Sequence, residues 1–183
     1  MRTILFSVMA ISLFISCVDK SLVSENNSGQ VEFYLLSDIK LYATDAAKKE
    51  LSALQLANEP LFTSEEISYY KWKEHGFYVD TVCAKKIRDV AKANQSVFGI
   101  PFVVTVNKER IYLGAFWFLY SSIAPSFPNI DVTFLSSPLQ QKFIISPAWT
   151  DGTPERRNDV RIYQALKAEG LLIECHVLKK VDY

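Results

Sequence analysis

The pattern of apolar and polar positions divides the chain into a leading apolar run and a longer region of short, alternating segments. From Ile4 to Ile15 the residues are apolar apart from Ser7 and Ser12, and Arg2 is the only charge before Asp19. A positive start followed by an apolar run is typical of a secretory signal peptide. A transmembrane helix needs about 20 consecutive apolar residues, so this run is too short to span a bilayer.

The next segments predict a tether and the start of a folded domain. Residues 21–30 are rich in Ser, Asn and Gly, which indicates a flexible connection and places the start of the domain at Val31. The aromatic and branched residues of Val31–Leu36 predict a strand. Apolar residues at helical spacing predict a short helix over Asp45–Gln55. Thr63–Glu66 has the spacing of a capping box, which predicts one helical turn.

Two hairpins are predicted in the middle of the chain. Aromatic-rich runs at Tyr69–Lys73 and Phe77–Val79 flank a turn that contains Gly76. The apolar run Phe102–Val106 and the segment Arg110–Phe116 are joined by an Asn-Lys turn, which predicts a second hairpin. Because both of its strands are almost continuously apolar, we expect this second hairpin to be central in its sheet.

Two amphipathic helices and two short strands complete the pattern. Residues Thr81–Asn94 carry apolar side chains every three or four positions and predict the clearest helix. A last helix is predicted over Asn158–Glu169, with Asn158 as its N-cap and Gly170 as its stop. Between the two helices, proline-separated runs at Asp131–Leu135 and Lys142–Ser146 predict edge strands.

Together these segments predict a single α+β domain over residues 31–183, with a mostly antiparallel sheet covered by two main helices. The 183 residues and an aromatic content of 13% are sufficient for one packed core. Lys and Arg number 20, as do Asp and Glu. Because the charges are balanced and form no basic cluster, we expect no nucleic-acid partner.

The apolar run ends at Phe14-Ile15-Ser16-Cys17, which resembles the lipobox of bacterial lipoproteins. In that family the cysteine thiol receives a diacylglyceryl group, the signal is cut just before it, and the new amine is acylated. The resemblance implies a signal peptide at 1–16, a mature chain that begins at lipidated Cys17, and stable anchoring in a membrane without a spanning helix. Leu is usual where this chain has Phe14, so cleavage by the ordinary secretory peptidase is the alternative.

The residue after the lipobox cysteine also bears on which membrane the protein is anchored in. In similar lipoproteins an acidic residue directly after the cysteine retains the protein at the inner membrane, and this chain has Val18 there. The resemblance therefore implies the outer membrane, with the domain facing either side. More broadly, the chain is similar to envelope lipoproteins of Gram-negative bacteria.

Residues 61–116 carry a second resemblance. A short turn at Ser64–Ile67, a hairpin, an amphipathic helix and the run Gly99–Val104 leading to Arg110–Tyr112 follow the element order of the head subdomain in the periplasmic part of the Sec protein-export membrane protein. That subdomain is a small α+β module without known catalytic residues. The resemblance implies a similar fold but no role in export, because this chain lacks the membrane spans of the exporter.

Few residues offer catalytic or metal-binding chemistry. His75, Asp80 and Cys83 form the only local trio for a thiol nucleophile, and the alternative is a buried structural Cys83 beside a solvent-facing His75 in a turn. In an oxidising compartment Cys83 and Cys175 would be able to form a disulfide, although spacing alone does not decide this. His75 and His176 are the only histidines, so the ligands for a zinc site are too few. We expect no metal and, without a phosphate-binding glycine loop, no cofactor.

The aromatic run Phe116-Trp117-Phe118-Leu119-Tyr120 offers a candidate binding surface. It leaves a predicted strand and enters a segment punctuated by Ser and Pro. Exposed rings of Trp117, Phe118 and Tyr120 would present an apolar patch to an envelope protein or a glycan. Rings that fill the core are the other interpretation.

Two functional hypotheses follow. The first is a membrane-anchored envelope lipoprotein with a non-enzymatic binding or structural domain. The second is a small periplasmic or surface hydrolase whose site lies in the loops after Trp117. Its candidate carboxylates are Asp131, Asp151 and Asp159, although turn and cap roles also explain such residues.

Overall fold

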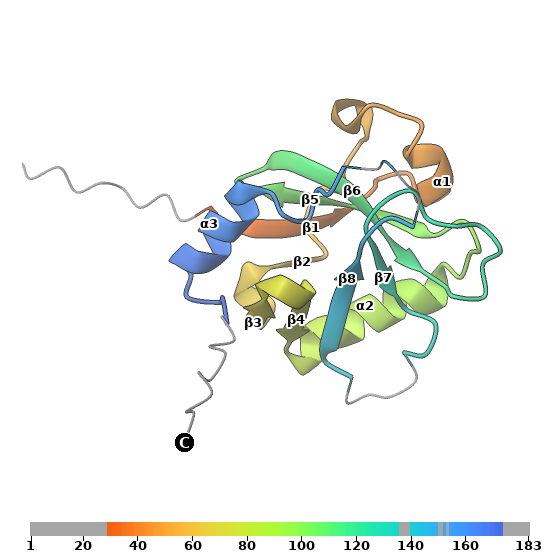
Figure 1. Cartoon of the computed structure of the whole chain (residues 1–183). Coiled ribbons are helices and arrows are strands. Elements are labelled where there is room, and N and C mark those ends of the chain that lie inside the picture. The colour runs from red at the N-terminus through yellow and green to blue at the C-terminus, as the bar shows by residue number, and fades with distance from the viewer. Residues whose placement is uncertain (1–28, 136–139, 150–151, 153, 174–183) are drawn as a thin grey trace, which may run out of the picture.

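The computed structural model describes residues 29–135, 140–149, 152 and 154–173 (Figure 1). The predicted signal peptide, Cys17, residues 18–20 and residues 21–28 of the predicted tether lie outside the described residues, as do Asp151, Cys175 and His176. Gln30, the last residue of the predicted tether, already contacts the domain. Its side chain donates to Thr63 Oγ1 at 3.4 Å, and its backbone N–H donates to Asn107 Oδ1 at 3.2 Å.

The described residues form a mixed α+β fold around one eight-stranded sheet that nearly closes on itself (Figure 1). The strands are β1 (Val31–Leu35), β2 (Phe62–Thr63), β3 (Ile67–Lys71), β4 (Gly76–Val79), β5 (Ile100–Val106), β6 (Glu109–Trp117), β7 (Asn129–Asp131) and β8 (Lys142–Ser146). The helices are α1 (Ala43–Ala46), α2 (Thr81–Ala93) and α3 (Val160–Ala168), with 3-10 turns η1 (Leu51–Ala53), η2 (Ser64–Glu66) and η3 (Trp72–Glu74).

The strand order is β2-β1-β5-β6-β7-β8-β4-β3, and among these neighbours only β6 and β7 run in parallel. The predicted hairpins are confirmed as β3–β4 and β5–β6. The second hairpin lies in the middle of the order, and every residue of β5 is buried. Its turn residues Asn107 and Lys108 have φ angles of 50° and 65°, the geometry that matches the twist of paired strands.

Local capping explains where the turns and helices begin. The predicted capping box is confirmed at η2, where the Glu66 carboxylate accepts from the Thr63 backbone N–H at 2.7 Å. The α2 helix is also confirmed, and Asp80 is its N-cap, accepting from the Cys83 backbone N–H at 2.6 Å. The last helix begins later than predicted. Its N-cap is Asp159, not Asn158, because the Asp159 carboxylate accepts from the Arg161 N–H at 2.9 Å.

The helix predicted over Asp45–Gln55 is wrong. The chain forms only the short α1 and η1 there, with extended backbone at Glu50 between them. Short helices have little stability of their own, and tertiary packing decides their extent. Ala46 and Leu54 each reach the same small apolar cluster, which also contains Val103 of β5, so two separate turns bury these residues where one helix was predicted.

The prediction of edge strands in the C-terminal part is also wrong. The β7 strand lies between β6 and β8, and β8 lies between β7 and β4. The β8 bounds match the predicted run, but β7 begins at Asn129 and ends at Asp131. Its end has a local cause, because the Asp131 carboxylate accepts from the Thr133 N–H at 2.8 Å and thereby forms a turn in place of further strand.

The main core is a set of aromatic rings inside the curved sheet. Phe33 of β1 stacks on Phe62 of β2, with 4.3 Å between ring centroids, and lies 5.9 Å from Phe77 of β4. Ile87 of α2 and Leu166 of α3 belong to the same buried cluster. Strands from both ends of the sheet and both longer helices therefore share one core.

Candidate functional site

The structure separates the three rings of the predicted binding surface. Trp117 and Phe118 are buried, with 1% and 3% of their surface exposed, whereas Tyr120 is 57% exposed. Trp117 packs against Phe127, with 5.7 Å between centroids. It also covers Gly99, where an added Cβ would lie 2.6 Å from the indole ring. Core filling therefore accounts for Trp117, and of the three predicted rings only Tyr120 lies on the surface.

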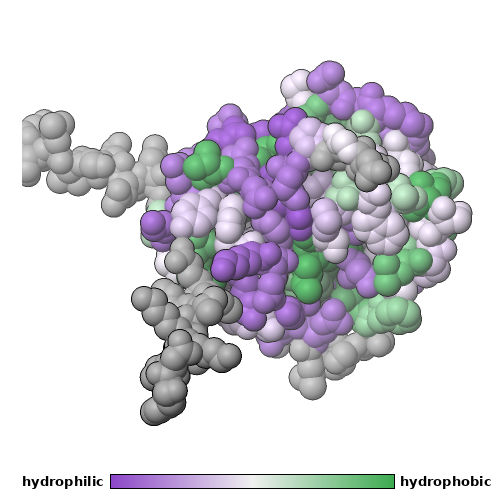
Figure 2. Space-filling view, viewed as in Figure 1, coloured by the Kyte–Doolittle hydropathy of each residue, from purple (hydrophilic) through white to green (hydrophobic). Residues whose placement is uncertain are grey.

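Tyr120 belongs to a larger set of exposed apolar side chains. The Ser121 hydroxyl donates to the Val97 carbonyl at 2.7 Å and joins the loop after β6 to the connection between α2 and β5. The ring of Phe98 in that connection lies 5.5 Å from the ring of Tyr42. We call this set the apolar rim; it consists of Tyr42, Val97, Phe98, Leu119, Tyr120 and Ile123. Figure 2 shows hydrophobic side chains gathered at the right of the view, where Figure 1 places these loops.

A cavity of about 220 Å³ lies beside the C-terminal half of α2, next to this rim. Phe118 and Tyr120, whose ring centroids are 5.2 Å apart, line one part of it. We call it the α2 cleft; its lining residues are Arg88, Ala91, Lys92 and Gln95 from α2 and its end, Phe118 and Tyr120 after β6, and Val132, Thr133 and Leu135 after β7.

The charged groups of the α2 cleft are both cations. Arg88 is only 9% exposed, and its Nη1 donates to the Gln140 carbonyl at 3.3 Å. Among the described residues Arg88 forms no salt bridge, because the neighbouring acid, Asp89, pairs with Lys85 at 2.6 Å. Lys92 follows Arg88 by one helical turn and lines the same cleft. The cleft therefore combines apolar walls with positive charge.

Sequence reasoning missed Arg88. The sequence pattern does single out this residue, because Arg88 lies between Ala84 and Ala91 at helical spacing and so interrupts the apolar face of α2. Arg88 is among the buried residues of α2, together with Ala84 and Ala91 of this face.

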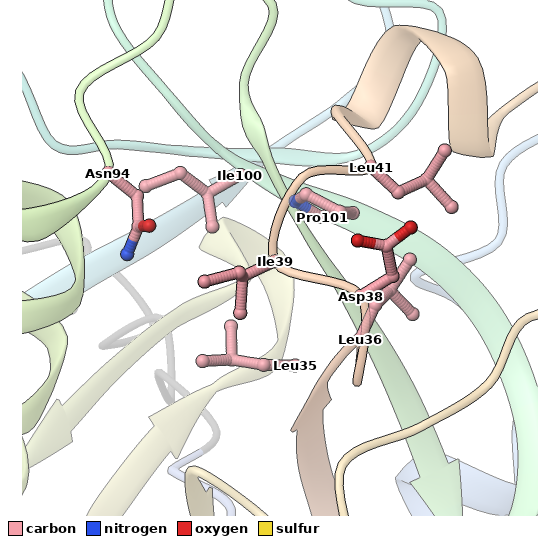
Figure 3. Close-up of a pocket in the computed structure, with 8 residues that line it drawn as sticks. All are labelled: Leu35, Leu36, Asp38, Ile39, Leu41, Asn94, Ile100 and Pro101. Carbon is pink, nitrogen blue, oxygen red and sulfur yellow. The ribbon is translucent and has the colours of Figure 1, made fainter.

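Two other hollows are less suited to bind a ligand. The pocket in Figure 3, where Ile39 and Pro101 lie near the end of β1, has a volume of about 30 Å³, the space of one water molecule. A groove of about 300 Å³ lies along β6, and its cations, Lys49 and Arg156, are exposed. Because exposed cations are already solvated, they create less demand for a bound anion than a buried one.

A second group of polar side chains, which we call the closed cluster, consists of the buried Tyr70, His75 and Tyr112, the partly buried Arg157 and, at its edge, the exposed Glu155. The expectation that His75 faces solvent is wrong, because His75 is 5% exposed. It ends η3 with a φ angle of 47°, and this left-handed conformation turns its ring inward. The Tyr70 hydroxyl and His75 Nδ1 are hydrogen-bonded at 3.1 Å.

Burial and charge set the protonation states of the closed cluster. Burial, followed by the nearby Arg157 guanidinium, lowers the pKa of His75 to about 4. Burial raises the pKa of the Tyr70 hydroxyl and holds that of Tyr112 well above its ordinary value. Arg157 itself pairs with the Glu155 carboxylate and donates to the Ile145 carbonyl at 2.6 Å. At neutral pH the cluster therefore holds a neutral imidazole, neutral phenols and one compensated ion pair.

The trio considered for a thiol nucleophile does not have the required arrangement. Cys83 is fully buried and free, and burial, followed by the Glu66 charge, raises the pKa of its thiol to about 12. Asp80 is engaged as the α2 cap, and the hydrogen bond of His75 Nδ1 is to Tyr70. The alternative of a structural Cys83 fits this geometry. Cys175, the second thiol of the disulfide considered, lies outside the described residues.

The carboxylates considered for a hydrolase have local roles where they are described. Asp131 forms the turn after β7, and Asp159 caps α3 and pairs with Arg161 at 2.7 Å. Asp151 lies outside the described residues. Within residues 29–135, 140–149, 152 and 154–173, no group of three or more His, Cys, Asp or Glu side chains is placed to hold a metal ion. No helix in this described part is long and apolar enough to cross a membrane.

Comparison of the chain with protein-family models, curated proteins and solved structures finds no match.

Proposed function

We propose that the chain is a lipid-anchored envelope lipoprotein whose single α+β domain, covered by α2 and α3, binds a ligand through the α2 cleft. The anchoring part of the proposal is supported by the N-terminal pattern that ends at Cys17. Val18, which is not acidic, favours the outer membrane through the lipobox resemblance. The binding part is supported by the geometry of the cleft.

The observation that carries the binding part is the combination of aromatic walls and cationic groups in one concave site. Small-molecule sites are typically apolar hollows in which a few polar groups fix the orientation of the ligand. In the α2 cleft, Phe118 and Tyr120 supply aromatic surface, while Arg88, Lys92 and Thr133 supply donors. The apolar rim beside the cleft extends the surface available to a larger partner, such as an envelope protein or a glycan.

The position of the cleft agrees with an anchored protein. In Figure 1 the chain enters β1 at the left of the molecule, whereas the loops that carry the rim lie at the right. An anchor attached through the segment before Val31 would therefore leave the rim and the cleft accessible at the far end of the domain.

The test of the anchor is to express the wild type and Cys17→Ser, fractionate the cells, and measure the mass of the mature N-terminus. We expect the wild type in the outer-membrane fraction, with a mature chain that begins at Cys17 and carries a diacylglyceryl and an acyl group. The Cys17→Ser variant should lose both the modification and the cleavage before residue 17. A wild-type chain that begins elsewhere, or an unmodified Cys17, would replace the lipoprotein proposal with an unanchored exported protein.

A hydrolase with its site in the loops after Trp117 is the second hypothesis, and it has less support. The groups that converge in the α2 cleft are donors and cations, which suit recognition of a ligand. General acid–base catalysis would need a titratable group with a pKa near the working pH beside the substrate. In the described part of the cleft, Arg88 and Lys92 are the charged side chains, and no carboxylate or imidazole lines it.

A further inference from the structure

We infer that the α2 cleft binds a small amphipathic anion: a carboxylate or phosphate group carried on an aromatic or aliphatic body. This inference rests on the proposed function, because it names the class of ligand for the cleft assigned there. It depends on the residues of the cleft alone and is independent of the lipid on Cys17.

The first argument is the unpaired charge of Arg88. A guanidinium offers five N–H donors, yet within the described residues the hydrogen bond of Arg88 is the single one from Nη1 to the Gln140 carbonyl. Arg88 is only 9% exposed, but in the described residues Trp117 Nε1 is the one buried side-chain nitrogen or oxygen without a partner, so the remaining guanidinium N–H groups of Arg88 reach the solvent of the cleft, where they have no carboxylate partner. Buried charges are otherwise paired, since an uncompensated one is costly. A bound anion would supply the missing partner, and a guanidinium suits the two oxygens of a carboxylate or phosphate.

The second argument is the arrangement of the other donors. Lys92 lines the cleft one turn after Arg88, so both cations are directed at the same ligand. The Thr133 oxygen accepts from the Leu119 N–H at 2.7 Å, which leaves the hydroxyl proton of Thr133 available to donate. The cleft thus presents donors from two sides to one anionic group.

The third argument is the apolar remainder and the size of the cleft. Ala91, Phe118, Val132 and Leu135 line the rest of it. A simple inorganic anion would leave these walls in contact with water, whereas a ligand with an apolar body would cover them. The volume of about 220 Å³ corresponds to roughly seven water-sized groups at about 30 Å³ each. The ligand body is therefore about the size of a phenyl ring or a short hydrocarbon chain.

The test is calorimetric titration of the full mature chain with 3-phenylpropionate, in nanodiscs of zwitterionic phosphatidylcholine where Cys17 carries a lipid and in buffer where it does not. Parallel titrations use phenyl phosphate, neutral 3-phenylpropanamide and acetate, which separate the charge of the ligand from its apolar body. We expect one molecule of 3-phenylpropionate or phenyl phosphate per chain, and binding at least about tenfold weaker for the neutral amide and for acetate, because each lacks half of the recognition.

The variants test the residues. Arg88→Met keeps most of the side-chain volume and removes the charge, so it should fold and bind 3-phenylpropionate at least about tenfold more weakly. Lys92→Gln should weaken binding by about threefold, because Lys92 is the more exposed cation. Lys85→Gln is the matched control, since Lys85 lies on the same helix outside the cleft, and its affinity should equal that of the wild type. If Arg88→Met does not fold, Lys92→Gln against Lys85→Gln carries the test.

The outcomes are distinct. Equal affinities for the acid and its amide, a folded Arg88→Met with unchanged affinity, or no binding of either anionic probe would overturn the inference. None of these results bears on the mass of the N-terminus, so the lipid anchor is judged separately. Repeating the titration in nanodiscs that contain phosphatidylglycerol identifies the source of the anion. Competition by this lipid would assign the cleft to an acidic headgroup, and unchanged binding would assign it to a free molecule.

Discussion

The α2 cleft and the closed cluster each contain an arginine, but among the described residues the fold supplies a carboxylate partner for only one of the two. Each contains a guanidinium that the fold largely or partly buries. In the closed cluster Arg157 meets the Glu155 carboxylate, and His75 meets the Tyr70 hydroxyl. In the α2 cleft Arg88 meets only a backbone carbonyl, within the part of the chain that the structure describes. Groups that the fold satisfies contribute to stability, whereas a group left without a partner at a cavity is available to a ligand.

The contrast predicts that changes inside the fold cost stability and changes at the cleft cost binding. The largest expected effect is that of Val104→Asp. Val104 of β5 is 1% exposed and pairs with Tyr112 of the closed cluster. A carboxylate there would be buried without a partner, so the free energy of unfolding should fall by at least about 4 kcal/mol. Circular dichroism should show an unfolded or strongly destabilised domain.

The control for this variant is Val97→Asp on the apolar rim, where the side chain is 39% exposed. It should retain the thermal transition of the wild type. An unchanged melting temperature in Val104→Asp would contradict the assignment of β5 to the interior of the sheet.

The second effect is the response of the closed cluster to acid. His75 has a pKa of about 4 in the folded domain and an ordinary value of 6.5. Between these values the unfolded chain binds a proton on His75 that the folded domain does not, so stability should fall as the pH drops from about 6.5 towards 4. The loss can reach about 3 kcal/mol, at about 1.4 kcal/mol per pH unit of difference. Urea unfolding at a series of pH values measures it.

The control is His75→Gln, which removes the titrating group. The acidic residues with lowered pKa values, Glu66, Asp89, Glu155 and Asp159, lose their contribution at lower pH in both proteins. The difference in slope between pH 6.5 and 4 therefore reports His75 together with its charge interaction with Glu155. Parallel slopes in the two proteins would show that His75 is exposed to solvent.

The sequence predicted the elements whose patterns are local. The β5–β6 hairpin, α2 and the capping box at Thr63 follow from turn residues, periodicity and caps, and all are confirmed. The helix over Asp45–Gln55 failed because distant Val103 gathers its apolar residues into one cluster. His75 was misplaced because its left-handed φ angle is not encoded by residue type, as it would be by glycine.

The candidate site was predicted only in part. Tyr120 and the region after Trp117 were identified from their aromatic run, but the opposite wall of the cleft comes from α2, and the pairing of these segments depends on the fold. Arg88 in the apolar face of α2 was visible in the sequence. Its lack of a carboxylate partner was not, because that depends on which acids lie near it in space.

A smaller effect is expected for Cys83→Ala. Cys83 is fully buried in α2, so its loss removes packing contacts and should lower the free energy of unfolding by about 1 kcal/mol. The affinity for 3-phenylpropionate should not change, because Cys83 does not line the α2 cleft. In the wild type the thiol should react with an aromatic disulfide reagent only after unfolding, as its pKa is about 12. Rapid reaction of Cys83 in the folded protein would revive the nucleophile hypothesis.

The smallest effect on stability is expected for Tyr120→Ser. This variant tests whether a residue of the cleft contributes to binding but not to stability. Tyr120 is 57% exposed, and its ring contacts Phe118 at 5.2 Å between centroids. The folded state therefore gains little from it, and the free energy of unfolding should change by no more than about 0.5 kcal/mol. A bound aromatic ligand would lose one of its stacking surfaces, so the affinity for 3-phenylpropionate should fall by about three- to tenfold.

Leu119→Ser is the matched control, because Leu119 is similarly exposed, at 49%, but does not line the cleft. Equal affinities in the two variants would show that the ligand does not reach Tyr120, whereas a loss confined to Tyr120→Ser would place its apolar body against the ring of Tyr120.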